Sequence, residues 1–253
     1  MVMKIQNYEG SADTFSWPHN PQSFDDPTIS NHQTTPIGFQ RHNILVSGAG
    51  ISPKNIILTG HFDGSSMFTN WRACSKHFMQ TTQLKKLYFE TDKFHLGIGK
   101  QVKRTQVGGR TNFIDYVCTF EAIISILFGD VAKTSGTNGG NTNTYVNSIT
   151  GTITDGAVDV VINDAEGNTI TIDAAHLTTG HTFSYDLVKM VDSGKGIYVS
   201  EYVYVELDGT QTANVQTTAG FGILQIGPGA NMTTINTSNI TTPVVTFRDG
   251  YTD

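Results

Sequence analysis

Histidines are the residues of this chain best suited to chemistry, because it contains eight and five of them lie in its first third. Metal sites need histidine, cysteine or carboxylate ligands at short spacings such as HxH or HExxH, and these five histidines show neither. His61 and Asp63 stand two residues apart, which places them on the same face of an expected strand. We interpret them as residues at the surface or at the edge of the core, and the sequence predicts no metal site.

Nucleophilic and acid–base catalysis have no recognisable signature either. The chain has no GxSxG elbow, and neither of its cysteines, Cys74 and Cys118, stands beside an obvious base. Both cysteines lie in apolar surroundings and are expected in the core. The adjacent carboxylates Asp25 and Asp26 precede a proline in a polar segment, where they make a poor acid–base pair. We therefore expect no catalytic residue and no cofactor, with a hydrolase of dispersed carboxylates as the alternative.

The run GPGAN, from Gly227 to Asn231, could instead be a loop that binds a phosphate. Such a loop needs backbone N–H groups at the start of a helix and usually a lysine. The Thr- and Asn-rich run that follows has low helix propensity, and no lysine occurs after Lys195. We predict a corner between two strands, in which Gly227 and Gly229 adopt positive φ and Asn231 tolerates the left-handed region.

The composition favours a β-rich protein that does not bind nucleic acid. Hydrophobic residues make up 38% of the 253 and charged residues 15%, with many Thr, Asn and Gly. The formal net charge is −6, whereas phosphate binding needs clustered Lys and Arg, and we interpret the one basic cluster, Gly99–Arg104, as a solvated strand face. No apolar stretch approaches the roughly 18 residues of a membrane span, and the first residues lack the apolar centre of a signal peptide. We expect a soluble chain made in the cytoplasm.

The elements that would position these residues begin with a polar arm. Residues 1–40 contain four prolines and scattered aromatics, and we expect an extended segment held in place by aromatics such as Trp17 and Phe24. Strands are predicted at 42–48 and 54–62, where apolar residues cluster.

A helix and a hairpin follow. Apolar residues recur at helical spacing after Ser65 and Ser66, either of which is a credible N-cap; they are Met67, Trp71, Cys74 and Phe78. Two strands joined at Gly108-Gly109 then form a hairpin, in which Phe113, Tyr116, Cys118 and Phe120 supply the bulk.

The second half is predicted to be almost wholly β. Residues 132–144 are a Gly-, Asn- and Thr-rich run that cannot bury apolar area, so we expect a linker or exposed loop and a domain boundary there. Beyond it, one hairpin turns at residues 165–168 and another near 208–210, with further strands at spacings of roughly 8–12 residues. The expected fold is mainly β with one helix: an α+β first domain and an all-β sandwich or barrel-like second domain.

Two groups of residues resemble one known family. A strand, a Trp-bearing helix and a hairpin follow each other in the first part, with Gly60 and Trp71 at the passage from strand to helix. The second part ends in an apolar strand, a turn at Pro228–Asn231, and a strand that closes on an arginine and an aromatic, Arg248 and Tyr251. In this order the chain resembles the distal tail protein family of tailed bacterial and archaeal viruses.

This resemblance implies a structural protein rather than an enzyme. In the family, an N-terminal domain forms a hexameric ring at the end of the tail tube, and a galectin-like or oligosaccharide-binding-type β domain decorates its outside. Residues 41–131 would be the ring domain and residues 145–253 the outer domain. The expected location is the virion tail, after assembly in the host cytoplasm. Expected partners are identical copies, the tail tube protein, and baseplate hub or tail-tip proteins.

Assembly, on this interpretation, depends on strand edges and aromatic side chains. The alternating block Phe94–Ser125 could extend a sheet across subunits, and the arm could reach over a neighbour. An acidic chain would let DNA pass through the bore without holding it. The side chains expected at assembly interfaces are Trp17, Phe24, Trp71, Phe113 and Tyr116.

Two other classes of protein fit the same order of predicted elements. Galectin-like domains often bind sugars through exposed aromatics, so the second domain could be a carbohydrate-binding module for a host surface glycan, with Tyr198, Tyr202 and Tyr204 as candidates. A major tail tube subunit with an added β domain would also fit. No membrane insertion is expected.

Overall fold

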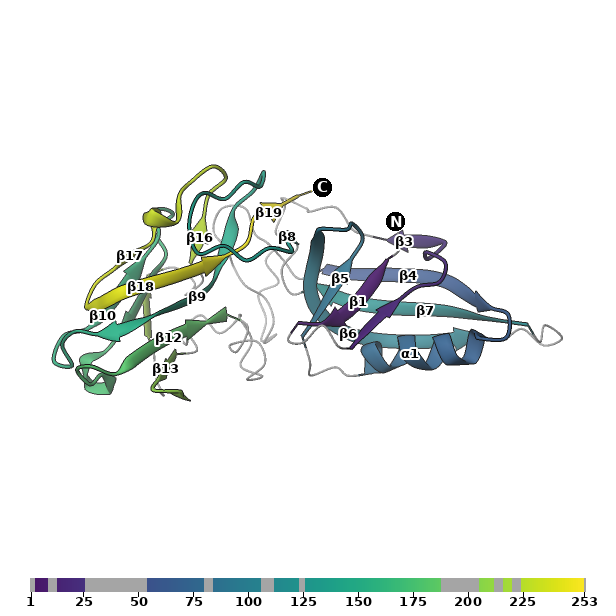
Figure 1. Cartoon of the computed structure of the whole chain (residues 1–253), viewed down its shortest axis with the longest axis horizontal. Helices are drawn as coiled ribbons and strands as arrows, with labels where there is room; N and C mark the ends of the chain where they lie inside the picture. The colour runs from purple at the N-terminus through teal and green to yellow at the C-terminus, as the bar shows by residue number, and fades with distance from the viewer. Residues whose placement is uncertain are drawn as a thin grey trace, which may run out of the picture. The chain divides into compact units, whose positions relative to one another are not determined.

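The computed structural model divides the chain into two compact units, which are described separately (Figure 1). Among the described residues, unit 1 holds those up to Leu127 and unit 2 those from Phe128 to Thr252. The structure describes residues 3–8, 13–25, 54–79, 84–105, 112–122, 126–187, 205–211, 216–219 and 224–252.

Unit 1 is built on one antiparallel sheet with the strand order β2-β1-β5-β6-β7-β4-β3. Its strands are β1 (Lys4–Asn7), β2 (Thr14–Ser16), β3 (Ser23–Asp25), β4 (Lys54–Asp63), β5 (Lys85–Tyr88), β6 (Lys93–Thr105) and β7 (Phe113–Ala122). The predicted strand at 54–62 is confirmed as β4, whereas the one at 42–48 lies outside the described residues.

The predicted helix is confirmed as α1 (Met67–Met79), which begins directly after Ser66. It packs against β4, β6 and β7, with Cys74 and Phe78 buried and Trp71 half-buried against the core. In β6, Gly99 allows this packing, because a Cβ there would overlap the Phe78 backbone. Helical periodicity in the sequence therefore identified the face that covers the sheet.

The first residues of the chain belong to the core of unit 1. Ile5, Phe15 and Trp17 are buried, and the rings of Phe15 and Trp17 meet edge to face with centroids 5.0 Å apart. Phe24 lies in β3, paired with Leu58 of β4. The part of the predicted arm that the structure describes is thus extended, as expected, and it also supplies three strands of the sheet.

The predicted hairpin is β6 and β7, which pair antiparallel up to Thr105 and Asp115. Its connector, with Gly108 and Gly109, lies outside the described residues. Ile114 and Tyr116 point into the core, whereas Phe113 is half-buried on the opposite face. The four side chains predicted to supply bulk are thus divided between two faces, because side chains three positions apart in a strand face opposite ways.

Unit 2 consists of antiparallel strands in two main sheets. One sheet has the order β14-β13-β12-β9-β16 with β18 also on β9, the other has the order β15-β11-β10-β17, and β8 pairs with β19. The strands are β8 (Leu127–Gly129), β9 (Thr144–Ile153), β10 (Val160–Asn163), β11 (Thr169–Ile172), β12 (Thr182–Asp186), β13 (Val205–Leu207), β14 (Thr210–Gln211), β15 (Gln216–Ala219), β16 (Gln225–Ile226), β17 (Asn236–Thr237), β18 (Ile240–Phe247) and β19 (Gly250–Tyr251). Two short 3-10 helices are η1 (Ala174–His176) and η2 (Met232–Thr234).

Both predicted hairpins of unit 2 are present. β10 and β11 pair with Val160 opposite Ile172, and both side chains are buried, although Val158 precedes the strand and is exposed. β13 and β14 turn at Asp208-Gly209, where both residues have positive φ, as a two-residue hairpin turn requires. The expectation of a mainly β fold with one α-helix is confirmed for the described residues. No helix among them is long and apolar enough to cross a membrane.

Candidate functional site: strand edges of unit 1 and a polar cluster of unit 2

The residues first considered for chemistry make ordinary surface pairs. His61 Nδ1 lies 2.9 Å from Gln22 Nε2, and His19 Nε2 lies 3.6 Å from an oxygen of Asp63. Within the described ranges, no group of three or more His, Cys, Asp and Glu residues could hold a metal ion. Asp26 and the three candidate sugar-binding tyrosines lie outside those ranges.

The GPGAN run is a corner whose backbone donors are used within the chain. Gly229 N donates to Asn138 O at 2.8 Å, and Ala230 N donates to Gly227 O at 3.0 Å. Gly229 has positive φ as predicted, but Gly227 does not, and Asn231 has a φ of −82°. Asn231 instead caps the short helix η2, because its side chain accepts a hydrogen bond from the N–H of Thr233. A phosphate would have to compete for N–H groups that are already bonded.

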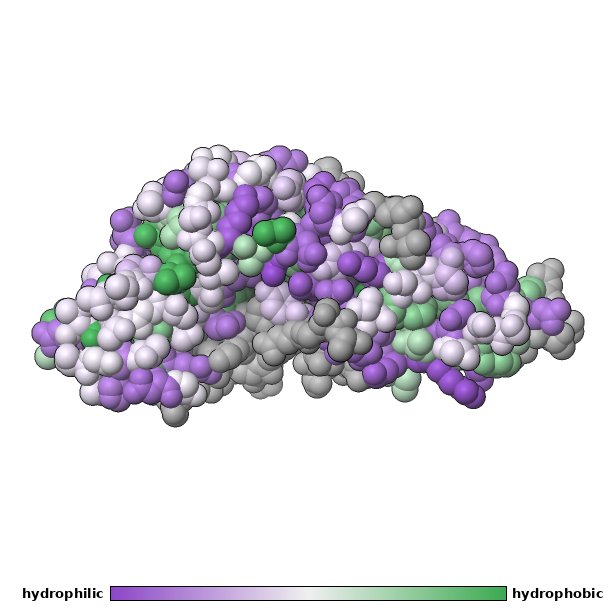
Figure 2. All heavy atoms as spheres, viewed as in Figure 1, coloured by the Kyte–Doolittle hydropathy of each residue, from purple (hydrophilic) through white to green (hydrophobic). Residues whose placement is uncertain are grey.

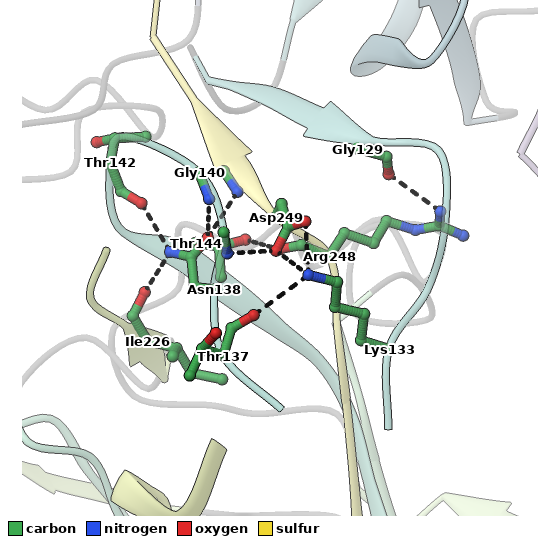
Figure 3. Close-up of polar contacts among 12 residues, drawn as sticks. Gly129, Lys133, Thr137, Asn138, Gly140, Thr142, Thr144, Ile226, Arg248 and Asp249 are labelled. Atoms are coloured by element: carbon green, nitrogen blue, oxygen red, sulfur yellow. Dashed lines mark hydrogen bonds and ion pairs between the residues drawn. The ribbon is translucent and has the colours of Figure 1, made fainter. Parts of the chain in front are cut away.

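Asn138 is the centre of a polar cluster in unit 2 (Figure 3). Its side chain is fully buried, and its amide nitrogen donates to Thr142 O at 2.8 Å and to Ile226 O at 3.0 Å. Its amide oxygen accepts from Gly140 N at 3.0 Å and from Gly250 N at 3.2 Å. One buried amide therefore joins three separate segments, and its hydrogen-bonding capacity is filled.

Charged residues extend this cluster to the C-terminal strands. Asp249 accepts from Lys133 Nζ and from Gly139 N, both at 2.7 Å. Arg248 donates from Nη1 to Gly129 O at 3.2 Å and also to Asp130 O. The whole set, Asn138, Lys133, Asp249 and Arg248 with their backbone partners, is called the Asn138 cluster.

The segment 132–144 differs from the predicted linker because of this cluster. It belongs to unit 2, forms backbone bridges from Lys133 to Phe247 and from Thr137 to Asn231, and leads into β9. A polar run needs no apolar area to be ordered when its backbone and side chains find internal hydrogen bonds. The division of the chain accordingly falls before Phe128 rather than within 132–144.

Unit 1 has two incompletely covered strand edges. On the side of β6 away from β7, the neighbouring strand β5 pairs only with Phe94–Gly97, which leaves part of Ile98–Thr105 without a strand partner in the part of the chain that the structure describes. On the far side of the same sheet, β3 pairs only with Ile57–Thr59 of β4. Gly60–Asp63 of β4 consequently has no strand partner on that side among the described residues. Unpaired edges of this kind are templates for another strand.

Exposed side chains of unit 1 lie both beside an edge and away from it. Lys103 and Arg104 on β6 are exposed beside its edge. Ile57 on β4 and Val117 on β7 are exposed at 37% and 39%, but they stand where their strands are paired on both sides. Figure 2 shows small hydrophobic areas among hydrophilic ones on the face in view, and no continuous apolar surface. Backbone edges, rather than a broad apolar patch, are therefore the candidate contact groups of unit 1.

The five aromatics predicted at interfaces occupy different places. Trp17 and Tyr116 are buried in the core of their own unit, and Trp71 packs against that core. Phe113 lies on the opposite face of the sheet, with its ring centroid 6.1 Å from that of His61. A role for these residues in assembly stays a prediction. The burial of Trp17 and Tyr116 in their own unit makes Phe113 and the strand edges the more accessible groups.

The edges and the Asn138 cluster were not found from the sequence. Whether a strand has an open edge depends on where the neighbouring strands end, and the sequence of the strand itself does not show this. Asn138 stands in a run that is typical of a flexible loop; its position before Gly139 and Gly140 was the available hint, because tight backbone turns bring an amide close to its neighbours.

Comparisons with known proteins identify the fold. No protein-family model and no curated protein matches the chain. The crystal structure of SPP1 Dit, a paradigm of the hub adsorption apparatus in phages that infect Gram-positive bacteria, aligns over 99% of this chain and 99% of its own, with a TM-score of 0.52 and 11% identity. A chain of the phage P2 baseplate in its activated conformation with Ca aligns over 98% and 97%, with a TM-score of 0.49 and 11% identity. The chain therefore shares the fold of a phage hub protein, SPP1 Dit, along its whole length.

Proposed function

We propose that the chain is a structural subunit of a phage tail, a distal tail protein whose copies form a ring that joins the tail tube to the baseplate or tail tip. The fold shared with SPP1 Dit over 99% of both chains supports this role. The proposal includes six copies per ring and a bore through which DNA passes unbound. The chain works by contact between proteins rather than by catalysis.

The observation that carries the proposal is the pair of unlike open edges in unit 1. β6 presents part of Ile98–Thr105 on one side of the sheet, and β4 presents Gly60–Asp63 on the other. An edge that meets a different edge of the next copy makes a head-to-tail contact, and such contacts close into rings. Lys103 and Arg104 are exposed beside the β6 edge, where charge keeps the free subunit from aggregating.

Unit 2 has an outer strand that is poorly suited to this role. β18 pairs with β9 on one side, and its register shifts between Thr241 and Val244. Within that irregularity Thr242 has a φ of 48°, and Pro243 has no N–H to donate. Bulges and prolines are devices that blunt an edge. Strand addition in a ring is therefore assigned to unit 1.

The distribution of charge also separates the units. Residues 1–127 have twelve Lys and Arg against nine Asp and Glu, a net charge of +3. Residues 128–253 have four against thirteen, a net charge of −9, and together these give the −6 of the whole chain. The acidity of the chain is thus a property of its second part.

Adjacent proline substitutions on β6 test the edge directly. Successive residues of a strand direct their N–H groups to opposite sides, so one of Lys103→Pro and Arg104→Pro removes an open-edge donor and the other removes a donor to β7. We expect the wild type to form rings by negative-stain microscopy and mass photometry. The variant that keeps the wild-type melting temperature should remain monomeric, and the destabilised variant is its matched control. Intact rings from both variants would contradict strand addition at β6, and a monomeric wild type at high concentration would contradict the proposed function.

A further inference from the structure

Two cysteines from different elements touch inside unit 1. Cys74 lies on α1 and Cys118 on β7, and both are fully buried. Their Sγ atoms are 3.8 Å apart, and the residues are 44 positions apart in the sequence. Both are free thiols. The function proposed above uses neither.

The geometry suits a covalent bond between them. A disulfide has an S–S distance of about 2.05 Å, so the two sulfur atoms must approach by a little under 2 Å, which side-chain rotation can supply when the two backbones are already packed. α1 packs on β7, which holds the two side chains in contact. No metal-ligand cluster includes these thiols within the described residues. They are therefore positioned to react with each other.

We propose that Cys74 and Cys118 are a latent disulfide that a small peroxide closes in the folded protein. One thiol loses its proton and attacks a peroxide oxygen, which gives a sulfenic acid and a hydroxide that takes up that proton and leaves as water; the second thiol attacks the sulfenic acid sulfur, and a second water leaves. Two thiols and one hydrogen peroxide thus give one disulfide and two waters. That a tail meets such oxidants after release from the cell rests on the proposed function, whereas the reaction itself does not.

Burial decides which oxidants act and how fast. It raises the pKa of the Cys74 thiol well above its usual range, helped by the hydrogen bond with Cys118, so little thiolate is present at neutral pH. Oxidation is consequently slow. Glutathione disulfide is too large for the core, while hydrogen peroxide is close to water in size. Reductants as large as glutathione are excluded in the same way, so the closed bond persists.

The bond would fasten the helix to the sheet. It would close a loop that contains the C-terminal half of α1, β5, β6 and β7 as far as Cys118, and a cross-link of this length stabilises a fold chiefly by restricting the unfolded chain. The open edge of β6 lies within that loop. Oxidation would therefore fix the part of unit 1 that the proposed ring uses.

The experiment is a non-reducing tryptic map of the purified full chain after treatment with hydrogen peroxide. We expect the peptide 73–76 to be joined to the peptide 111–133, with a mass about 2 Da below their sum, and to separate after dithiothreitol. Intact oxidised protein should melt several degrees higher than the reduced form. Met79, which is 71% exposed, shows in the same digest that the peroxide was active.

Cys74→Ala and Cys118→Ala are the matched controls, since each keeps one buried thiol. Neither should gain melting temperature on treatment. The proposal is overturned if Met79 is oxidised while the wild type keeps two thiols that iodoacetamide labels after unfolding, or if each cysteine gains oxygen without a cross-link. Ring formation is scored in the same samples by microscopy. Rings without the cross-link would refute the disulfide alone, and the cross-link without rings would refute only the proposed function.

Discussion

At the scale of single residues, unit 1 contains a buried titratable group. His77 on α1 is almost fully buried, and its Nε2 lies 3.8 Å from Oδ1 of Asp13. The other carboxylate oxygen of Asp13 accepts a hydrogen bond from Lys76 Nζ at 2.9 Å. Burial, together with the positive charge of the nearby Lys85, lowers the pKa of His77 to about 4, although Asp13 opposes the shift. The folded protein therefore holds His77 neutral.

This burial makes unit 1 sensitive to acid. Between about pH 6.5, where an exposed histidine titrates, and about pH 4, the unfolded chain binds a proton that the folded chain does not, so stability falls as pH falls through that window. His77→Gln should make this decline shallower. Urea unfolding at several pH values between 4 and 7.5 measures how the free energy of unfolding changes with pH. At pH 7.5 both states hold His77 neutral, so a difference between the variant and the wild type there reports a loss of packing alone. If His77→Gln had the same dependence of unfolding free energy on pH as the wild type, His77 would not be the group that causes the decline.

The Asn138 cluster gives a second prediction at this scale. Asp249→Ala leaves Lys133 Nζ and Gly139 N without the carboxylate that accepts from both. We expect a loss of roughly 2–4 kcal/mol in the free energy of unfolding, since hydrogen bonds to a charged group contribute about 1.5–3 kcal/mol each. Glu90→Ala, which breaks the exposed pair with Lys93, is the control and should cost under about 1 kcal/mol. Far-UV circular dichroism in urea compares them, and equal losses would refute a structural role for the cluster.

At the scale of elements, β1, β2 and β3 make the first residues part of the sheet. A truncation of residues 1–30 would remove Ile5, Phe15 and Trp17 from the core, so lost rings would then report unfolding rather than a lost contact with a neighbour. Single substitutions separate the two effects better. The chain has two tryptophans, both in unit 1, so each reports on unit 1 when the other is replaced.

Replacing each tryptophan in turn tests the position of β2. Trp17 is fully buried, so Trp17→Ala should cost about 3–5 kcal/mol, as for other large aromatics removed from a core. Trp71 is half-buried on α1, so Trp71→Ala should cost clearly less. Fluorescence of the remaining tryptophan during urea unfolding gives both values. A Trp17→Ala variant as stable as the wild type would place the indole outside the core.

Elements were predictable where local pattern decides them. Helical spacing identified α1, and turn residues such as Asp208-Gly209 identified hairpins. The pattern failed where distant contacts decide the outcome. Phe113 is a large apolar residue whichever face of the strand it occupies, so the sequence does not show its direction. Residues 132–144 are held by hydrogen bonds to partners more than a hundred positions away, such as Asp249. The open edges of the candidate site are of the second kind, because they are set by the lengths of β3 and β5.

At the scale of the whole molecule, the units differ in charge and in the edges that they present. If unit 1 pairs through backbone groups as proposed, the net charge of −9 on residues 128–253 makes assembly a balance between strand addition and repulsion of like charges. The repulsion is long-ranged at low salt and screened within about 8 Å at physiological ionic strength.

Salt should therefore favour rings. Raising the ionic strength from about 0.01 M to about 0.15 M, which shortens the screening length from about 30 Å to about 8 Å, should increase the fraction of assembled chains. Mass photometry at fixed protein concentration measures that fraction, with potassium chloride and potassium glutamate compared to exclude a specific ion. Rings that dissolve as salt is added would show that ion pairs between copies dominate the contact.

The kink at Thr242-Pro243 has a consequence for how much of this protein a cell can tolerate. On the proposed assembly through unit 1, an outer strand of unit 2 that cannot add another strand would confine growth of a polymer to one axis, and growth would end when the ring closes. Overproduced chains would thus accumulate as closed rings of fixed size. Fibres would indicate that the kink at Thr242-Pro243 had been lost.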